Sequence, residues 1–343
     1  MTTSAIDVRP WGDMHLHTLR NASGMRVDIS DLGATLVSWH APDRAGHLDD
    51  VLLGHDTPAE YLDSTAFMGG IIGRWANRIR DARYVLDGLT HEVEANEGAN
   101  HLHGGSAGFH RQMWRAEHVD GVLVMHLRSP AGAAGFPGNL DVTVRYALAD
   151  DGTLSLDYEA RTDAPTPVNL TNHAYFNLSG EQGEDASVRD HRITIHAREF
   201  FAIDAGSIPV AREDATNTAF DCHTPQTIGE RLALSNEQLK LAGGFDHCYI
   251  FDDAKAPRAV ASLFDPSSGR ELLVASDAHG LQFYTGNHLE GVAARGGARY
   301  RKHAGLCLEA GGFPNEINMD GGHAVLRPGE VYRQRTRYTL RVR

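Results

Sequence analysis

Short segments in which apolar and polar residues alternate are separated along this chain by turn sequences rich in aspartate, proline and glycine. Such alternation places apolar side chains on one face of a β-strand, and a short turn between two such segments predicts an antiparallel hairpin. Three hairpins are predicted in this way: residues 83–86 with 89–93, residues 140–148 with 153–160, and residues 259–264 with 271–275.

The C-terminal segment alternates most clearly of all. One face carries Tyr332, Gln334, Thr336, Tyr338, Leu340 and Val342, and the other carries Arg333, Arg335, Arg337 and Arg341. The arginines alone are compatible with a nucleic-acid-binding surface, but the strand alternation favours the solvated face of a sheet.

Helical patterns are few and short. Residues 228–240 contain leucines at helical spacing and predict one helix, and residues 58–63 predict a brief helical turn. No repeat, low-complexity tract or Pro/Gly/Ser-rich linker divides the chain. We therefore predict one all-β domain over residues 1–343, a large antiparallel sandwich of two packed sheets, with the first ten or so residues loosely ordered.

Composition and charge limit the classes of function that fit this chain. The 343 residues are 41% hydrophobic and 22% charged, which is typical of a globular protein with a sizeable core. The net charge of −13 disfavours nucleic acid as a partner and is compatible with a neutral small molecule. Because neither a signal-peptide pattern nor a long apolar stretch is present, we expect no membrane association and a cytoplasmic location.

The three cysteines, Cys222, Cys248 and Cys307, are far apart in sequence and form no C-x-x-C motif. The simplest interpretation is that all three are free thiols in a reducing cytoplasm and pack as small buried hydrophobic residues.

Candidate proton-transfer groups occur in two motifs. His173 lies in Thr171-Asn172-His173-Ala174-Tyr175, and Glu309 follows the apolar residues Leu306-Cys307-Leu308. Histidine and glutamate are the usual acid and base because modest shifts bring both near neutral pH. A carboxylate at the end of a buried strand would have a raised pKa and could act as a base. The alternatives are a hydrogen-bonded core histidine and a solvated strand end.

Candidate sugar-binding groups lie elsewhere. Asn77 and Arg78 offer an amide and a guanidinium for hydroxyl groups, although a turn with an ion pair is the more common role. Asp246 follows a flexible Gly243-Gly244 pair and could equally be a plain turn aspartate. The aromatic ring of Tyr175 could contact the apolar face of a hexose.

His101-Leu102-His103 could be half of a metal site, because alternate residues of a strand share a face. No companion glutamate follows at tight spacing, and Gly104-Gly105 instead suggests a tight turn that presents a side chain to a pocket. A nucleophile elbow, a phosphate-binding loop and a dinucleotide fingerprint are all absent from the sequence.

Taken in order, these motifs closely resemble the aldose 1-epimerase (galactose mutarotase) family. The resemblance runs nearly end to end. It is carried by residues 21–25, 32–36, 42–44, 50–54, 73–79, 102–105, 171–173, 244–247, 281–287, 306–309 and 326–330. Each motif is weak alone, whereas their joint order and spacing are specific.

The resemblance implies a galactose mutarotase-like β-sandwich that interconverts the α and β anomers of free aldoses. It implies that Glu309 is the general base and His173 the general acid. It also assigns His103, Asn77, Arg78, Asp246 and Gln282 to sugar binding. No metal or other cofactor is implied, and we expect a monomer or weak homodimer. Because this chemistry needs an ionised Glu309 and a protonated His173, a bell-shaped pH profile is expected.

The chain departs from the family pattern beside the expected site. Ala310 and Gly311 follow Glu309 where a hydroxyl residue and Gln are common, Asn315 replaces an Asp, and His101 replaces a smaller residue. Three other functions remain open. They are a sugar-binding protein without catalysis, a metal-dependent enzyme that uses His101 and His103, and a sugar-phosphate epimerase that uses Arg74 and Arg78.

Overall fold

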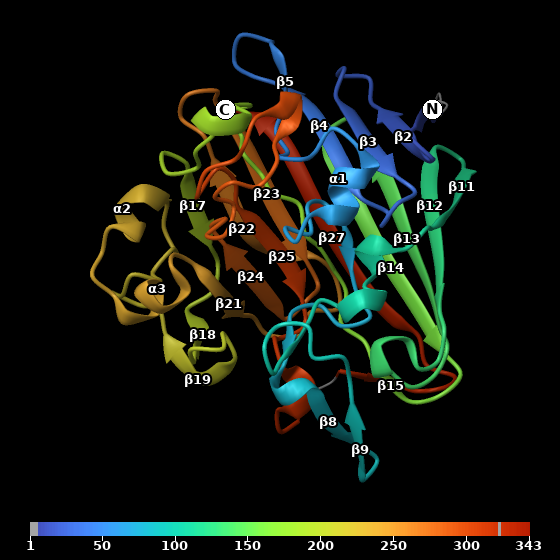
Figure 1. Cartoon of the computed structure of the whole chain (residues 1–343). Coiled ribbons are helices and arrows are strands. Elements are labelled where there is room, and N and C mark those ends of the chain that lie inside the picture. The colour runs from blue at the N-terminus through green and yellow to red at the C-terminus, as the bar shows by residue number, and fades with distance from the viewer. Residues whose placement is uncertain (1–5, 322–323) are drawn as a thin grey trace.

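The computed structural model describes residues 6–321 and 324–343 (Figure 1). Its largest element is a nine-stranded antiparallel sheet. In spatial order the strands are β11 (Arg115–Val119), β12 (Val122–Ser129), β13 (Leu140–Leu148), β14 (Thr153–Thr162), β27 (Tyr332–Val342), β23 (Arg270–Ser276), β22 (Arg258–Phe264), β17 (Arg192–Ile195) and β20 (Gln226–Thr227).

The predicted alternation is present in this sheet. Every second residue of β13 from Leu140 to Tyr146 is buried, and in β27 the residues from Gln334 to Leu340 alternate in the same way. The arginines of β27 lie on the outer face, where Arg337 pairs with Asp157 and Arg341 with Glu271. The hairpins β13–β14, β22–β23 and β8–β9 are confirmed.

A five-stranded N-terminal sheet covers one part of the inner face. Its strands follow chain order: β1 (Asp7–Trp11), β2 (Met14–Arg20), β3 (Arg26–Ser30), β4 (Leu36–Pro42) and β5 (Leu48–Asp50). The Tyr146 hydroxyl of β13 donates a hydrogen bond to the Ala34 carbonyl at 2.7 Å and joins the two layers. Because residues 7–11 pair with β2, the expectation of a loosely ordered start is wrong for them; residues 1–5 lie outside the described residues.

A second five-stranded sheet covers the other part of the inner face. Its spatial order is β19 (Pro209–Asp214), β18 (Glu199–Ile203), β21 (Asp246–Ile250), β24 (Gly280–Tyr284) and β25 (Cys307–Gly311). The Tyr338 hydroxyl donates to the Leu308 carbonyl, and the Gln334 side-chain amide donates to the Ala310 carbonyl. These bonds hold β25 against β27.

The largest core cluster lies between the big sheet and the two smaller ones, and its members run from Leu19 to Leu340. The predicted all-β sandwich is confirmed. Four two-stranded pairs complete the strands: β6 (Ile71–Ile72) with β16 (Thr171–Asn172), β7 (Arg78–Ile79) with β10 (His101–Leu102), β8 (Arg83–Leu86) with β9 (Leu89–Glu92), and β15 (Thr166–Pro167) with β26 (Val325–Leu326).

Three short α-helices occur in the described ranges, namely α1 (Pro58–Asp63), α2 (Ile228–Leu232) and α3 (Glu237–Ala242). The single helix expected over residues 228–240 is therefore wrong. Asn236 has extended backbone angles, and its side chain accepts from the backbone N–H groups of Gln238 and Leu239. Such a cap starts a new helix, so the leucine pattern is divided between two helices.

The three cysteines are free and buried, as predicted. None of the helices described here is both long and apolar enough to span a membrane.

Candidate active site

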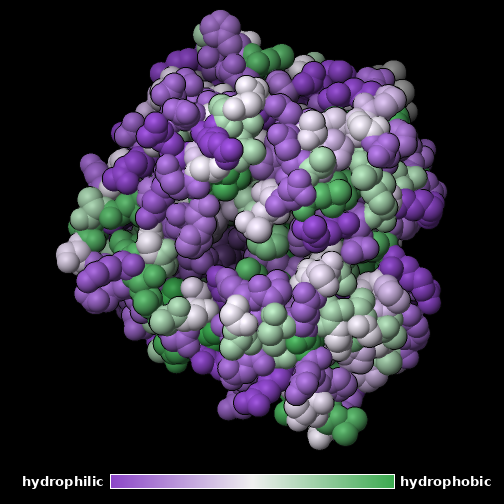
Figure 2. All heavy atoms as spheres, in the orientation of Figure 1, coloured by the Kyte–Doolittle hydropathy of each residue, from purple (hydrophilic) through white to green (hydrophobic). Residues whose placement is uncertain are grey.

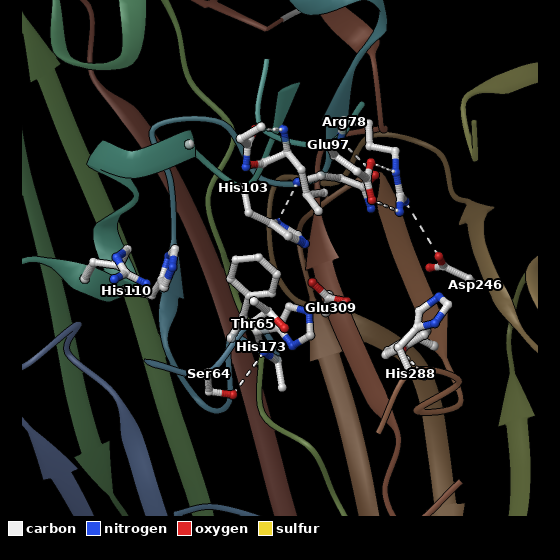
Figure 3. Close-up of a pocket in the computed structure, with 18 of the residues that line it drawn as sticks. Ser64, Thr65, Arg78, Glu97, His103, His110, His173, Asp246, His288 and Glu309 are labelled. Atoms are coloured by element: carbon white, nitrogen blue, oxygen red, sulfur yellow. Dashed lines mark hydrogen bonds and ion pairs between the residues drawn. The ribbon is translucent and has the colours of Figure 1, made fainter. Parts of the chain in front are cut away.

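A cavity of about 550 Å³ opens near the middle of the face seen in Figure 2, where hydrophilic residues surround the hollow. Figure 3 gives a close view of its walls. Seven of the eight predicted site residues line it: Asn77, Arg78, His103, His173, Tyr175, Asp246 and Glu309. They come from chain segments more than 230 residues apart and meet only in the fold.

Three neighbouring strands supply one wall of the cavity. Glu309 on β25 lies directly opposite Gln282 on β24, and Asp246 on β21 lies opposite Tyr284 on β24. Because side chains alternate along a strand, these residues project from one face of the sheet. Leu281, Phe283 and Leu308 project from the other face into the core.

Glu309 is only 6% exposed. Burial raises the pKa of its carboxyl group well above the ordinary value, the negative charge of Asp246 raises it further, and Arg78 partly opposes both. The direction predicted from the apolar residues before Glu309 is confirmed.

His173 follows β16 and is held in place by its backbone. Its N–H donates to the Gly70 carbonyl, and its own carbonyl accepts from the Gly69 N–H. His173 is 4% exposed, and burial lowers its pKa to about 4. The Cys307 sulfur lies 3.5 Å from Nδ1 and supports the side of the ring away from the cavity.

The two groups form a close pair, with Nε2 of His173 3.7 Å from Oε1 of Glu309. The lowered histidine pKa and the raised carboxyl pKa both favour the uncharged side chains, neutral His173 and protonated Glu309. The mechanism expected from sequence uses the opposite arrangement, an ionised Glu309 and a protonated His173. The pair still contains one transferable proton, because exchanging it between the two residues leaves the total unchanged.

His103 and Asn77 lie in two turns that bind each other. Both have positive φ angles, 52° and 66°, and the Asn77 backbone N–H donates to Nδ1 of His103 at 3.1 Å. A backbone N–H can only donate, so Nδ1 is an acceptor and the ring proton is on Nε2. His103 therefore presents an N–H donor to a ligand.

Arg78 is clamped from two sides. Its Nε and Nη2 donate to Glu97 at 2.6 and 2.8 Å, and its Nη1 lies 3.6 Å from Asp246 (Figure 3). Two parallel hydrogen bonds fix the guanidinium plane. A sugar hydroxyl in the cavity would meet an oriented cation next to a carboxylate.

Gln282 is the predicted site residue that does not line the main cavity. Its Nε2 donates to Oδ1 of Asp246 at 2.7 Å, and it lines a much smaller cavity behind Glu309. The structure thus places Gln282 where it orients Asp246.

Aromatic rings form the apolar part of the wall. The Tyr175 ring lies 5.1 Å from that of His173 and 6.0 Å from that of Tyr284. Phe67, with a positive φ of 57°, lies 4.6 Å from the His103 ring. Such surfaces suit the apolar faces of a sugar ring.

In the described ranges, His103, His173 and Glu309 form the one cluster with metal-ligand spacing, their candidate atoms within 4.8 Å of one another. A metal ion needs a lone pair from each histidine, but Nε2 of His103 carries its proton. The cluster is therefore better suited to hydrogen bonding. His101 does not join it; its Nδ1 donates to the Glu94 carbonyl, and its ring packs against Phe136.

The other departures from the family pattern also lie behind the cavity. Ala310 is buried on the core side of β25. The backbone N–H of Asn315 donates to the Arg78 carbonyl, and its side chain accepts from the Arg80 N–H, so it supports the segment that carries Arg78. Arg74 is 2% exposed and donates to the carbonyls of Pro137 and Gly138.

Sequence reasoning missed Glu97, Phe67, His110 and His288, which also line the cavity. Glu97 lies in a loop, and Phe67 has a backbone conformation that only the fold reveals. Neither has a periodic pattern that could have marked it.

Comparisons with known proteins agree with this geometry. Residues 15–339 match the family model described as aldose 1-epimerase. The aldose 1-epimerase of Escherichia coli K12 is 39% identical over 94% of this chain and 94% of its own length. The galactose mutarotase of Bos taurus is 38% identical over 93% of this chain and 92% of its own length.

Two solved structures are similar throughout. An aldose epimerase homologue from C. elegans has a TM-score of 0.88 at 26% identity, covering 96% of this chain and 99% of its own. A galactose 1-epimerase from Lactobacillus acidophilus has a TM-score of 0.84 at 28% identity, covering 98% and 99%. This chain belongs to the aldose 1-epimerase family.

Proposed function

We propose that this protein is an aldose 1-epimerase (mutarotase) that interconverts the α and β anomers of free aldohexoses such as glucose and galactose. The observation that carries the proposal is the pair of His173 and Glu309, buried, 3.7 Å apart, and placed in a cavity lined by hydroxyl-binding groups. An acid and a base in contact are what ring opening and reclosure require.

In this mechanism Glu309 removes the proton of the C1 hydroxyl while His173 donates a proton to the ring oxygen. The bond between C1 and O5 breaks, the open aldehyde rotates about C1–C2, and the reverse transfers close the ring on the other face. The reactive form needs only the movement of the shared proton from Glu309 to His173, without uptake from solvent. Each proton transfer contributes ~10²–10⁴ to the rate.

The other residues have distinct roles. The Nε2–H of His103 and the side-chain amide of Asn77 donate to sugar oxygens, and Asp246 accepts from sugar hydroxyls. Arg78 stabilises negative charge that develops on the substrate, because Glu97 fixes its plane. Tyr175 packs against the sugar ring, and Gln282 acts through Asp246.

The rival functions have less support. A sugar-binding protein does not need a buried acid and base in contact. A sugar-phosphate epimerase would need a free arginine, whereas Arg74 is enclosed by backbone carbonyls and Arg78 is paired with two carboxylates. The tautomer of His103 argues against metal-dependent chemistry.

We further propose that the chain works as one domain, as a monomer or weak homodimer in the cytoplasm. A core cluster that spans residues from Leu19 to Leu340 supports the single domain. Three free, buried thiols are compatible with a reducing compartment, and the net charge of −13 disfavours nucleic acid as a partner.

Polarimetry of freshly dissolved α-D-glucose and α-D-galactose tests the activity directly. We expect the protein to speed the approach to the same final optical rotation that each sugar reaches alone, and heat-denatured protein to have no effect. If neither these sugars nor xylose and arabinose respond, the proposed function is wrong.

A further inference from the structure

A second cavity, of about 510 Å³, is lined by residues of α2, α3 and the turn between them. Both helices lie at the left of the molecule in Figure 1. The segment Lys302–His303 forms the other side of the cavity. The polar and charged side chains on its wall are Arg189, Ser235, Asn236, Lys240, Lys302 and His303, together with the carboxylate of Glu237. None of them belongs to the candidate active site.

Positive charge is concentrated in this cavity against the trend of the chain. The protein has a net charge of −13 and only three lysines, Lys240, Lys255 and Lys302, and two of these line the cavity with Arg189. Within the described ranges no carboxylate lies within ion-pair distance of Lys240, Lys302 or Arg189. Glu290 is nearby, but it accepts from the backbone N–H of Lys302.

His303 adds a buried polar group to the wall of this cavity. It is 8% exposed, and its Nδ1 donates to the Thr285 carbonyl at 2.7 Å, so Nε2 is its remaining polar atom. Burial lowers its pKa, and the charges of Lys302 and Arg189 lower it further. The positive charges of Lys302 and Arg189 therefore act on this ring, and a bound anion would offset them.

The cavity is also connected to the sugar-binding strands. Gly243 and Gly244 join α3 to β21, which begins at Asp246. The Asn287 side chain donates to the carbonyls of Ala242 and Phe245, and its neighbour Thr285 is the residue that His303 contacts. A ligand here would lie beside Gly243 and Gly244, the residues that lead into the strand of Asp246.

We propose that this cavity binds the dianionic phosphate group of a small molecule through Arg189, Lys240 and Lys302. Its volume also leaves room for the organic part of a phosphomonoester. The site is separate from sugar binding, so a sugar and the anion bind together.

Titration calorimetry of the intact protein with inorganic phosphate and with glycerol 3-phosphate tests this site, and the two probes separate free phosphate from an esterified one. The double variant Lys240→Ala/Lys302→Ala should bind at least about ten-fold more weakly, because two of the three positively charged donors are lost. Lys255→Ala is the matched control, since it removes the remaining lysine, and should bind as the wild type does.

Two further measurements test where phosphate binds and whether it competes with a sugar. In NMR spectra the His303 ring signals should move on phosphate addition, and excess galactose should leave the phosphate affinity unchanged. The proposal is wrong if neither probe binds saturably by about 10 mM, if the double variant binds like Lys255→Ala, or if galactose displaces phosphate. Because binding is measured without turnover, loss of the proposed activity would not affect this result.

Discussion

Two separate backbone segments bring the reactive atoms at the centre of the site together. β25 presents Glu309, and the segment that follows β16 presents His173. Both side chains are almost fully buried, so each loses the stabilisation of its charged form by water. Burial therefore favours a pair that holds one proton in total.

The shared proton predicts the pH dependence of kcat/KM. Below about pH 4 His173 is protonated while Glu309 also keeps its proton, so the pair holds two protons. Glu309 then cannot transfer its proton to His173 and cannot act as a base. Above the raised pKa of Glu309 both residues are deprotonated, and the acid is lost. We expect a bell-shaped profile with its acid limb near pH 4, measured after subtraction of spontaneous mutarotation. An acid limb near pH 6.5 would contradict the lowered histidine pKa.

Replacement of His173 by Asn should remove the acid while retaining a polar side chain. We expect kcat to fall by about 10²–10⁴ with a smaller change in KM. Progress curves over a range of galactose concentrations separate the two constants. A variant with normal kcat would mean that another group protonates the ring oxygen.

Asp246→Asn tests a binding role instead. The substitution keeps the shape of the side chain but removes the charge that accepts sugar hydroxyls, so KM should rise about ten-fold with kcat changed less. Asp253→Asn is a suitable control, because Asp253 is an exposed carboxylate outside the sugar cavity. Equal effects of both substitutions on KM would argue against direct contact.

At the scale of elements, the His103 turn depends on a glycine. Gly104 has a φ of +85°, and a Cβ there would lie 2.0 Å from the Gly73 carbonyl oxygen. Gly88, in the β8–β9 turn, has a similar φ of +80° but nothing within 4 Å of its Cβ position. An alanine at either position would have to adopt the same unfavourable left-handed backbone conformation. Only at position 104 would its Cβ also collide with a neighbouring atom.

Gly88→Ala should cost about 1–2 kcal/mol through the left-handed conformation alone. Gly104→Ala should cost at least about 2 kcal/mol more, because the backbone around His103 must move. It should also lower kcat/KM, whereas Gly88→Ala should leave activity unchanged. Chemical denaturation and polarimetry measure the two effects, and equal destabilisation would rule out the steric contact.

Local patterns account for the elements that could be predicted. Alternation and Asp-Gly turns identified the hairpins β8–β9 and β13–β14, because both strands and their turn are contiguous in sequence. The break between α2 and α3 was missed, because the cap at Asn236 acts against an unbroken leucine pattern.

Many residues of the candidate site could be predicted from the sequence, but most of the contacts between them could not. The motif residues that line the cavity were identified through the family resemblance, and the raised carboxyl pKa of Glu309 followed from its apolar neighbours. The clamp of Glu97 on Arg78 and the role of Gln282 behind Asp246 depend on contacts between distant segments. No sequence pattern encodes those contacts.

At the scale of the whole molecule, buried neutral histidines link stability to pH. Burial lowers the pKa of His191 and His247 to about 4 and that of His110 to about 3. Between pH 6.5 and 4 the unfolded chain binds protons that the folded chain does not, so the free energy of unfolding falls as the pH falls.

Within that pH range, each such histidine lowers the free energy of unfolding by about 1.4 kcal/mol for each unit by which the pH falls. We expect the melting temperature to be nearly constant from pH 8 to 7 and to fall steeply from pH 6 to 4. His191→Gln should remove one of these histidines, so the free energy of unfolding should depend on pH less steeply, by about 1.4 kcal/mol per pH unit. A melting temperature independent of pH from 6.5 to 4 would contradict the burial of these rings in neutral form.

In the proposed mechanism Glu309 is the base that removes the proton of the C1 hydroxyl. Polarimetry of fresh α-D-galactose with wild type and Glu309→Gln in parallel tests it most directly, with calorimetric galactose binding as evidence that the variant is folded. We predict that the wild type speeds the approach to the final rotation, while the variant binds galactose and leaves the rotation at its spontaneous rate. Near wild-type acceleration by Glu309→Gln would contradict the assignment of the base.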